Sequence, residues 1–201
     1  MDSSVHLKLA IVIPAYNASQ TIERVFERIP SAVQPQIVNY IVVNDGSTDD
    51  TAAVLTRLQQ SYPNVIVLHH DVNQGYGAAE KTLLHCAVET EADVVVLLHA
   101  DGQYAPEKLP KLLEPFTAEA ADIVQGSRMM EGRAALRGGM PRYKYVANRG
   151  LTAIENMAFG LRWRNITAAT CFTLDAPCKR FHLRNLATPF ALTKKCSSWP
   201  K

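Results

Sequence analysis

The sequence lacks long apolar runs. Among its 201 residues, no stretch approaches the roughly 18 consecutive apolar residues of a membrane-spanning helix. The N-terminus also lacks the basic and then apolar order of a signal peptide. Together these absences predict a cytoplasmic protein. Paired cysteines are missing as well: the four cysteines form no C-x-x-C motif, so neither a zinc site nor a disulfide scaffold is indicated.

The chain has little excess charge of either sign. Its formal net charge of +2 is too small to indicate nucleic acid as a partner. Basic residues do concentrate between Arg128 and Arg149, where Glu131 is the one acidic residue. This segment predicts either a solvated helix face or a surface that attracts phosphate. The length and the hydrophobic fraction of 47% are those of an ordinary globular domain.

Common nucleotide and nucleophile motifs are also missing. The sequence contains no P-loop and no G-x-S-x-G motif. The nearest approach to a dinucleotide-binding G-x-G-x-x-G is Gly75-Tyr76-Gly77, but Glu80 stands where the third glycine belongs. This motif follows the third expected strand, whereas the dinucleotide fingerprint follows the first. A nicotinamide-dependent dehydrogenase is therefore disfavoured.

Short apolar runs alternate with segments of helical periodicity over most of the chain. Strands that are apolar on both faces and alternate with helices predict an α/β fold, with a mostly parallel sheet and helices on both faces. Ser47 is expected to cap the second helix. The expected strands cover residues 9–14, 40–43, 65–68, 93–98 and 123–124, and the expected helices cover residues 21–28, 51–60, 78–89 and 106–116.

Polar residues follow each expected strand at its carboxyl end. Ligands bind outside these ends in open parallel sheets, so these residues are expected to line one crevice. The Asp45 carboxylate could accept a hydrogen bond from a ribose hydroxyl or a base N–H there, or it could merely shape a turn with Gly46. The strand ends are residues 14–17, 44–47, 69–71, 99–103 and 126–128.

The residues after the fourth expected strand suit a hard divalent cation. Asp101 and Gln103 place two oxygen donors two positions apart on a turn. Mg²⁺ or Mn²⁺ takes such oxygens together with substrate phosphates. His99 could add a nitrogen ligand or act as a plain hydrogen-bonding residue. Main-chain N–H groups around Gly75 and Gly77 could face an anion where the third helix begins.

Four ordered motifs resemble those of the family 2 inverting glycosyltransferases, in the branch of the polyprenyl-phosphate sugar synthases that includes dolichyl-phosphate mannose synthase. The motifs are IVIPAYN at 11–17, VVNDGSTD at 42–49, NQGYG at 73–77 and HADGQY at 99–104. The resemblance implies a Rossmann-like nucleotide-diphospho-sugar transferase fold of type A and a GDP- or UDP-sugar donor. It also implies Mg²⁺ or Mn²⁺ as cofactor and a polyprenyl phosphate as acceptor. The basic segment would then suit the acceptor phosphate or peripheral contact with the inner face of a membrane.

The resemblance also implies which residues form the site. The D-x-D motif of the family reads His99-Ala100-Asp101 here, so Asp101 is the expected essential metal ligand, with Gln103 and His99 beside it. Ala18 replaces an acidic residue of the family, which removes one polar contact. The residues expected to bind the nucleotide-sugar are Pro14, Ala15, Tyr16, Asn17, Asp45, Gly46, Ser47, Gly75, Gly77, Lys81, Ala100, Asp101 and Arg128.

The resemblance ends after about residue 163. The family continues with a segment that holds the general base, but residues 164–173 read RNITAATCFT, so no catalytic residue is assigned. Codons that these residues permit, read in a neighbouring frame, allow the family-like Glu-Tyr-His-Ser-Gly-Tyr. We therefore expect a glycosyltransferase domain at 1–163 and a tail at 164–201, produced by a frameshift near Trp163 or by true divergence. Such a chain would bind the donor but transfer slowly, and the alternative is a non-catalytic nucleotide-sugar-binding module.

Overall fold

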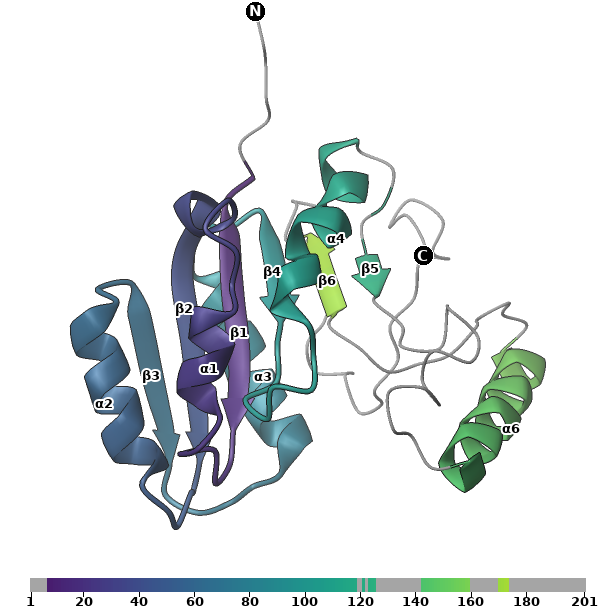
Figure 1. The fold of residues 1–201 in the computed structure, drawn as a ribbon, viewed down its shortest axis with the longest axis horizontal. Helices are drawn as coiled ribbons and strands as arrows, with labels where there is room; N and C mark the ends of the chain where they lie inside the picture. The colour runs from purple at the N-terminus through teal and green to yellow at the C-terminus, as the bar shows by residue number, and fades with distance from the viewer. Residues whose placement is uncertain (1–6, 119–120, 122, 126–141, 160–169, 174–201) are drawn as a thin grey trace, which may run out of the picture. The chain divides into compact units, whose positions relative to one another are not determined.

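The computed structural model describes residues 7–118, 121, 123–125, 142–159 and 170–173 (Figure 1). These residues fall into two compact units. Of the described residues, the first unit holds 7–118, 121, 123–124 and 170–173, and the second holds 125 and 142–159. The expected site residue Arg128 lies outside the described residues.

The first unit is built on a six-stranded sheet. Its strands are β1 (Leu9–Ala15), β2 (Ile37–Asp45), β3 (Val65–His70), β4 (Val94–Leu97), β5 (Ile123–Gln125) and β6 (Thr170–Thr173). Their order in the sheet is β3-β2-β1-β4-β6-β5. β1 pairs in parallel with β2 and β4, and β2 pairs in parallel with β3, whereas β6 runs antiparallel to β4. The expected mostly parallel sheet is confirmed.

Helices cover both faces of this sheet. The first unit contains α1 (Ile22–Glu27), α2 (Thr51–Ser61), α3 (Tyr76–Val88) and α4 (Leu109–Thr117), with 3-10 turns at Gln34–Gln36 and Pro106–Lys108. Leu83 of α3 joins a buried cluster with Val12 of β1 and Val43 of β2. On the other face, the Phe26 ring of α1 lies 4.9 Å from that of Tyr40 on β2. Figure 1 accordingly shows α1 in front of the sheet and α3 behind it. Because successive strand residues point to opposite faces, a strand covered on both sides must be almost wholly apolar, as β1 is.

Two parts of the fold differ from the expectation. The helix expected over 106–116 is divided into the turn at Pro106–Lys108 and α4. One continuous α-helix would need an N–H at Pro110 to reach the carbonyl of Pro106, and proline has none. β6 comes from the segment after residue 163, in which the sequence pattern predicted no element. Its Phe172 pairs with Val95 of β4, so that part of this segment belongs to the sheet.

The second unit is described as a single helix, α6 (Arg142–Phe159). Five large apolar side chains of this helix are 57–81% exposed. At about 100° of turn per residue, these five positions lie on one face of the helix. These residues are Tyr143, Val146, Leu151, Ile154 and Met157. Within the described ranges, no helix combines the length and the apolar composition needed to cross a membrane.

Candidate functional site

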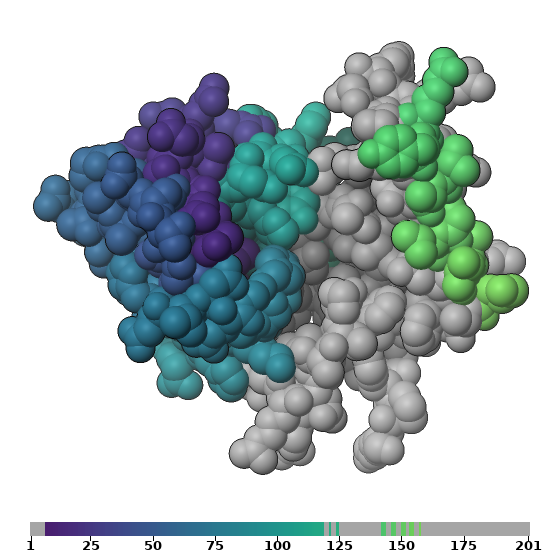
Figure 2. All heavy atoms as spheres, turned by 90° about the horizontal axis from the view of Figure 1, so that it is seen from below, coloured from purple at the N-terminus to yellow at the C-terminus, as the bar shows by residue number. Residues whose placement is uncertain are grey.

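A cleft of about 300 Å³ opens at the carboxyl ends of β1, β2 and β4. Figure 2 is seen from the side toward which the arrows of β1, β2 and β4 point in Figure 1. The position agrees with the general rule that open parallel sheets bind ligands beyond their carboxyl ends. The cleft is lined by Pro14, Ala15, Tyr16, Asn17, Ala18, Thr21, Asp45, Asn73, Gly75, Tyr76, Ala79, His99, Ala100 and Asp101.

Most of the residues expected in the site therefore lie together. Those that line the cleft are Pro14, Ala15, Tyr16, Asn17, Asp45, Gly75, His99, Ala100 and Asp101. Those that do not line it are Gly46, Ser47, Gly77, Lys81 and Gln103. The prediction that the strand end at 69–71 lines the same crevice is wrong, and Asn44 and Gly102 of two other strand ends do not line it either. The lining residues that were not assigned to the site from the sequence are Ala18, Thr21, Asn73, Tyr76 and Ala79. Asn73 and Tyr76 lie inside the motif at 73–77, and the other three lie within four positions of a motif, so the motifs were the signal available for them.

Asn17 and Ser47 join the loops that follow β1 and β2. The main-chain N–H of Asn17 donates to Ser47 Oγ (3.0 Å), and Asn17 Oδ1 accepts from the N–H of Thr48 (2.9 Å). Asn17 has a positive φ of 49°, which asparagine tolerates better than most residues. The prediction that Ser47 caps α2 is wrong, because Asp50 is the residue at the N-cap. The hydroxyl of Ser47 instead accepts the hydrogen bond from the main-chain N–H of Asn17.

Asp49 fastens the same two loops. Its carboxylate accepts hydrogen bonds from the main-chain N–H groups of Ser19 (3.1 Å) and Thr51 (3.0 Å). Hydrogen bonds from Ser19 and Thr51 lower the pKa of Asp49 to about 2. The N–H of Ala18 donates to Thr51 Oγ1 (2.8 Å). Polar contacts between two loops thus fix this wall of the cleft.

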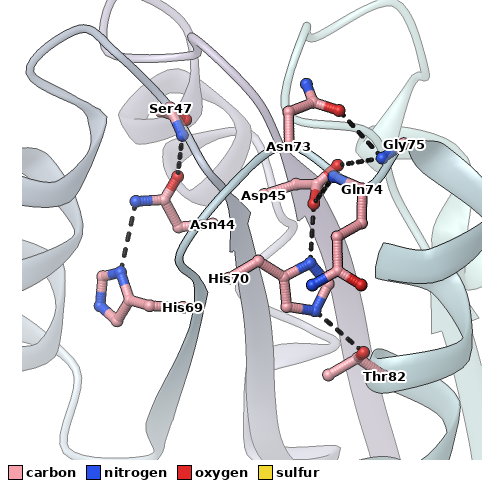
Figure 3. Close-up of polar contacts among 9 residues, drawn as sticks. All are labelled: Asn44, Asp45, Ser47, His69, His70, Asn73, Gln74, Gly75 and Thr82. Atoms are coloured by element: carbon pink, nitrogen blue, oxygen red, sulfur yellow. Dashed lines mark hydrogen bonds and ion pairs between the residues drawn. The ribbon is translucent and has the colours of Figure 1, made fainter.

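Asp45, at the end of β2, is buried and hydrogen-bonded through both carboxylate oxygens (Figure 3). Oδ1 accepts from the Gln74 N–H (3.0 Å) and lies 2.7 Å from His70 Nδ1, while Oδ2 accepts from the Gly75 N–H (2.9 Å). Burial raises the pKa of the Asp45 carboxyl, but hydrogen bonds from Gln74, His70 and Gly75 lower that pKa below its ordinary value. Asp45 therefore shapes the loop after β3 as well as lining the cleft. The Gly75 N–H, which we expected to face a bound anion, donates to this carboxylate instead.

The turn after β4 carries the two expected oxygen ligands. Asp101 Oδ1 accepts from the Gln103 N–H (2.9 Å), and Gly102 between them has a φ of 70°. In the part of the chain that the structure describes, no three His, Cys, Asp or Glu side chains are grouped to hold a metal ion. The carboxylate and amide oxygens of this turn nevertheless fit a hard cation that takes its remaining ligands from phosphate and water. The residues thus fit Mg²⁺ or Mn²⁺ held jointly with a bound diphosphate.

His99 stands between two tyrosines at this corner. Its Nε2 lies 3.2 Å from the Tyr76 hydroxyl, and its ring meets that of Tyr104 edge-on with 4.4 Å between centroids. Burial raises the pKa of the Tyr76 phenol, so this hydroxyl stays protonated at neutral pH. The structure thus shows His99 in its hydrogen-bonding role, and its role as a metal ligand stays a prediction.

Arg28, which the sequence did not indicate, braces the turn after β4. Its Nη1 donates to the carbonyl of Gly102 (2.8 Å), and its Nε and Nη2 donate to the carboxylate of Glu107 (2.7 and 3.2 Å). The guanidinium therefore ties both sides of the loop that holds Asp101 to the end of α1. Arg28 and Gly102 are 74 positions apart, so no local pattern could have revealed this contact.

Known proteins are similar to this chain in sequence and in fold. Residues 10–178 match the family described as Glycosyl transferase family 2. The chain is 32% identical over 162 residues to the UDP-N-acetylglucosamine–dolichyl-phosphate N-acetylglucosaminyltransferase of Methanococcus voltae. It is 34% identical over 162 residues to the undecaprenyl-phosphate mannosyltransferase of Micrococcus luteus. These alignments cover 75% and 81% of this chain, which spans 62% and 64% of the length of the two relatives.

A solved structure has a similar fold. The glucosyl-3-phosphoglycerate synthase of Mycobacterium tuberculosis, in complex with Mn²⁺, UDP and phosphoglyceric acid, matches with a TM-score of 0.56 at 23% identity. The match covers 84% of this chain and 56% of that one, and it confirms the expected nucleotide-diphospho-sugar transferase fold. The family match continues past Trp163, and the division of the chain at that residue stays a prediction. With ordered motifs, fold and relatives in agreement, this chain belongs to glycosyl transferase family 2.

Proposed function

We propose that the cleft binds a nucleotide-diphospho-sugar together with Mg²⁺ or Mn²⁺, as the donor site of an inverting glycosyltransferase. One observation carries the proposal: residues 14–17, Asp45 and Asp101 meet in a single cleft although they come from three separate motifs. The names of the relatives specify UDP-N-acetylglucosamine with dolichyl phosphate in one case and undecaprenyl phosphate in the other. We extend this substrate class, a GDP- or UDP-sugar and a polyprenyl phosphate acceptor, to the present chain.

Different residues of the site would bind the nucleoside and the metal ion of such a donor. Residues 14–17 and Asp45 would hold the nucleoside. Asp45 Oδ2 accepts one hydrogen bond from the described residues, so it can accept a second one from a ribose hydroxyl or a base N–H. Asp101 and Gln103 would hold the metal ion. When bound, that ion neutralises charge on the departing diphosphate. Inversion then requires the acceptor oxygen to attack from the side opposite the diphosphate.

Transfer by this chain is expected to be slow. A general base typically contributes about 10²–10⁴ in rate, and the segment after Trp163 offers none in the expected place. The frameshift hypothesis requires that the encoding nucleic acid contain a family-like continuation in the neighbouring frame, and sequencing it would test this. A non-catalytic binding module is the second candidate, and it would show donor binding with no transfer at all.

Calorimetry with UDP and GDP tests the proposed function directly. With Mn²⁺ present, one of the two nucleotides should bind at least about tenfold more tightly than in EDTA, because the metal links the diphosphate to Asp101. NAD serves as the control and should not bind. Failure of both nucleotides to bind, or equal affinity with and without metal, would contradict the proposal. A radiolabelled sugar-transfer assay then separates slow transfer from none.

Contact with the inner face of a membrane stays a prediction. The exposed apolar face of α6, with Arg142 at the start of the helix, is typical of amphipathic helices that bind at a membrane interface. Co-sedimentation of the chain with anionic vesicles is the measurement that tests it, and an unchanged supernatant would argue against it.

Replacement of Arg28 by alanine should weaken metal binding without removing it. The carbonyl of Gly102 and the carboxylate of Glu107 would lose their common donor, so the loop that holds Asp101 would be less well ordered. We expect the Mn²⁺ concentration for half-maximal UDP or GDP binding to rise about tenfold, as is common when a residue that supports metal ligands is removed. Arg57→Ala is the matched control, since Arg57 pairs with Glu23 (3.3 Å) and does not line the cleft. Equal effects of the two substitutions would refute a specific role for Arg28.

A further inference from the structure

His70 belongs to the strand end at 69–71 that we expected to line the crevice, but it does not line the cleft. It ends β3 opposite Asp45 of β2, and this parallel pairing places the two side chains on the same face of the sheet. His70 Nδ1 lies 2.7 Å from Asp45 Oδ1, and Nε2 lies 3.0 Å from Thr82 Oγ1 on α3 (Figure 3). The side chains of His70 and Asp45 are only 10% and 5% exposed, so water hardly competes for these hydrogen bonds.

The partners of the imidazole indicate its hydrogen positions. A carboxylate can only accept, so Nδ1 must carry the hydrogen that it donates to Asp45. The Thr82 hydroxyl can then donate to Nε2 of a neutral ring. One imidazole thus connects the end of β2 to α3, and it restricts the Asp45 carboxylate to one orientation.

Asp45 in turn holds the loop that follows β3. Two consecutive N–H groups, those of Gln74 and Gly75, donate to its carboxylate, and the Gly75 N–H is shared with Asn73 Oδ1 (2.9 Å). Asn73 and Gly75 line the cleft beside Asp45, whereas His70 does not. A shift of the Asp45 carboxylate would therefore displace the loop as well as the oxygen proposed to accept a hydrogen bond from the nucleoside.

We propose that His70 is a positioning residue of the donor site: it orients Asp45, and through Asp45 the loop 73–75, for binding of the nucleotide. This inference rests on the proposed function of the cleft. It assigns His70 an effect on nucleotide affinity although His70 does not line the cleft. The neighbouring His69 supplies a matched control, since it lies on the opposite face of the strand and pairs with Asn44 (3.3 Å).

Two substitutions of His70 distinguish orientation of Asp45 from simple filling of space. Asparagine carries its amide nitrogen on Cγ, at the place of Nδ1, and can still donate to Asp45. Glutamine is closer to histidine in size, but its amide corresponds to Nε2 and points away from Asp45. With Mn²⁺ present, the Kd for UDP or GDP should rise about tenfold in His70→Gln, the usual effect of losing one hydrogen bond to a charged group. It should rise less than about threefold in His70→Asn and in His69→Gln.

Amide hydrogen exchange measured without ligand keeps this inference separate from the proposed function. Exchange at Gln74 and Gly75 should accelerate in His70→Gln and stay near the wild-type rate in His70→Asn. Nucleotide binding by the wild type with equal affinities in the two His70 variants would overturn the role of His70 alone. Unchanged amide exchange at Gln74 and Gly75 in His70→Gln would likewise overturn the role of His70 alone. Absence of nucleotide binding by the wild type would overturn both proposals, even if exchange at Gln74 responds.

Discussion

Replacement of Asp101 by asparagine is expected to remove the effect of Mn²⁺ on nucleotide binding. The amide oxygen of asparagine can still accept from the Gln103 N–H, so the turn with its positive φ at Gly102 is retained. The substitution removes the negative charge by which a carboxylate binds a divalent cation. The Kd for UDP or GDP with Mn²⁺, measured by calorimetry, should rise roughly 100-fold, toward the value in EDTA.

Asp71→Asn provides the matched control for this experiment. Asp71 is an exposed carboxylate just after β3, and it does not line the cleft. Its loss changes the net charge by the same amount, and the Kd should change by less than about twofold because exposed charges at a distance are screened. Equal losses in both variants would mean that net charge and not a metal ligand governs the affinity. An Asp101→Asn variant that keeps the full response to Mn²⁺ would rule out Asp101 as the ligand.

Replacement of Gly46 by alanine should be among the most destabilising single changes in the chain. Gly46 has a φ of 63°, and a Cβ built on it would overlap main-chain atoms of Val72 and Asn73. The left-handed conformation alone costs an alanine about 1–2 kcal/mol. The overlap adds to this cost, because the backbone of residues 72 and 73 must move and cannot avoid the Cβ by a change of side-chain rotamer. We expect the free energy of unfolding, measured by urea titration, to fall by about 3 kcal/mol or more.

The second readout of this substitution is the cleft itself. Asn73 lines the cleft, so displacement of residues 72 and 73 should also weaken nucleotide binding in whatever fraction still folds. Gly77→Ala is the control, since a Cβ at Gly77 in α3 meets no heavy atom within 4 Å apart from its chain neighbours and the adjacent backbone of its own helix. Because alanine favours the helix, Gly77→Ala should be neutral or stabilising by up to about 1 kcal/mol. A Gly46→Ala variant as stable as the wild type would contradict the close approach of the two loops.

The positions of strands β1 to β5 could be predicted from the sequence, but their ends could not. The apolar pattern indicated a strand over 40–43, whereas β2 extends from Ile37 to Asp45 and includes Asn39, Asn44 and Asp45. Asparagine and aspartate disfavour strands when judged locally. In the sheet, neighbouring strands supply main-chain partners whatever the side chain is, and β2 lies between β1 and β3. Asn44 and Asp45 are therefore the last residues of a strand and not the first of a loop.

The sequence by itself determined the alternation of strands and helices, the family, and the four motifs that meet at one edge of the sheet. Periodicity and motif spacing suffice for this, because they report which faces are buried and in which part of the chain a strand lies. Only the tertiary structure decided that Asp45 is held by His70 and the loop after β3, and that Arg28 braces the turn of Asp101. These contacts join residues 25 and more positions apart, and they depend on strand register and helix packing. Sequence periodicity and motif spacing do not specify strand register or helix packing, so they do not show which distant side chains come within hydrogen-bonding distance.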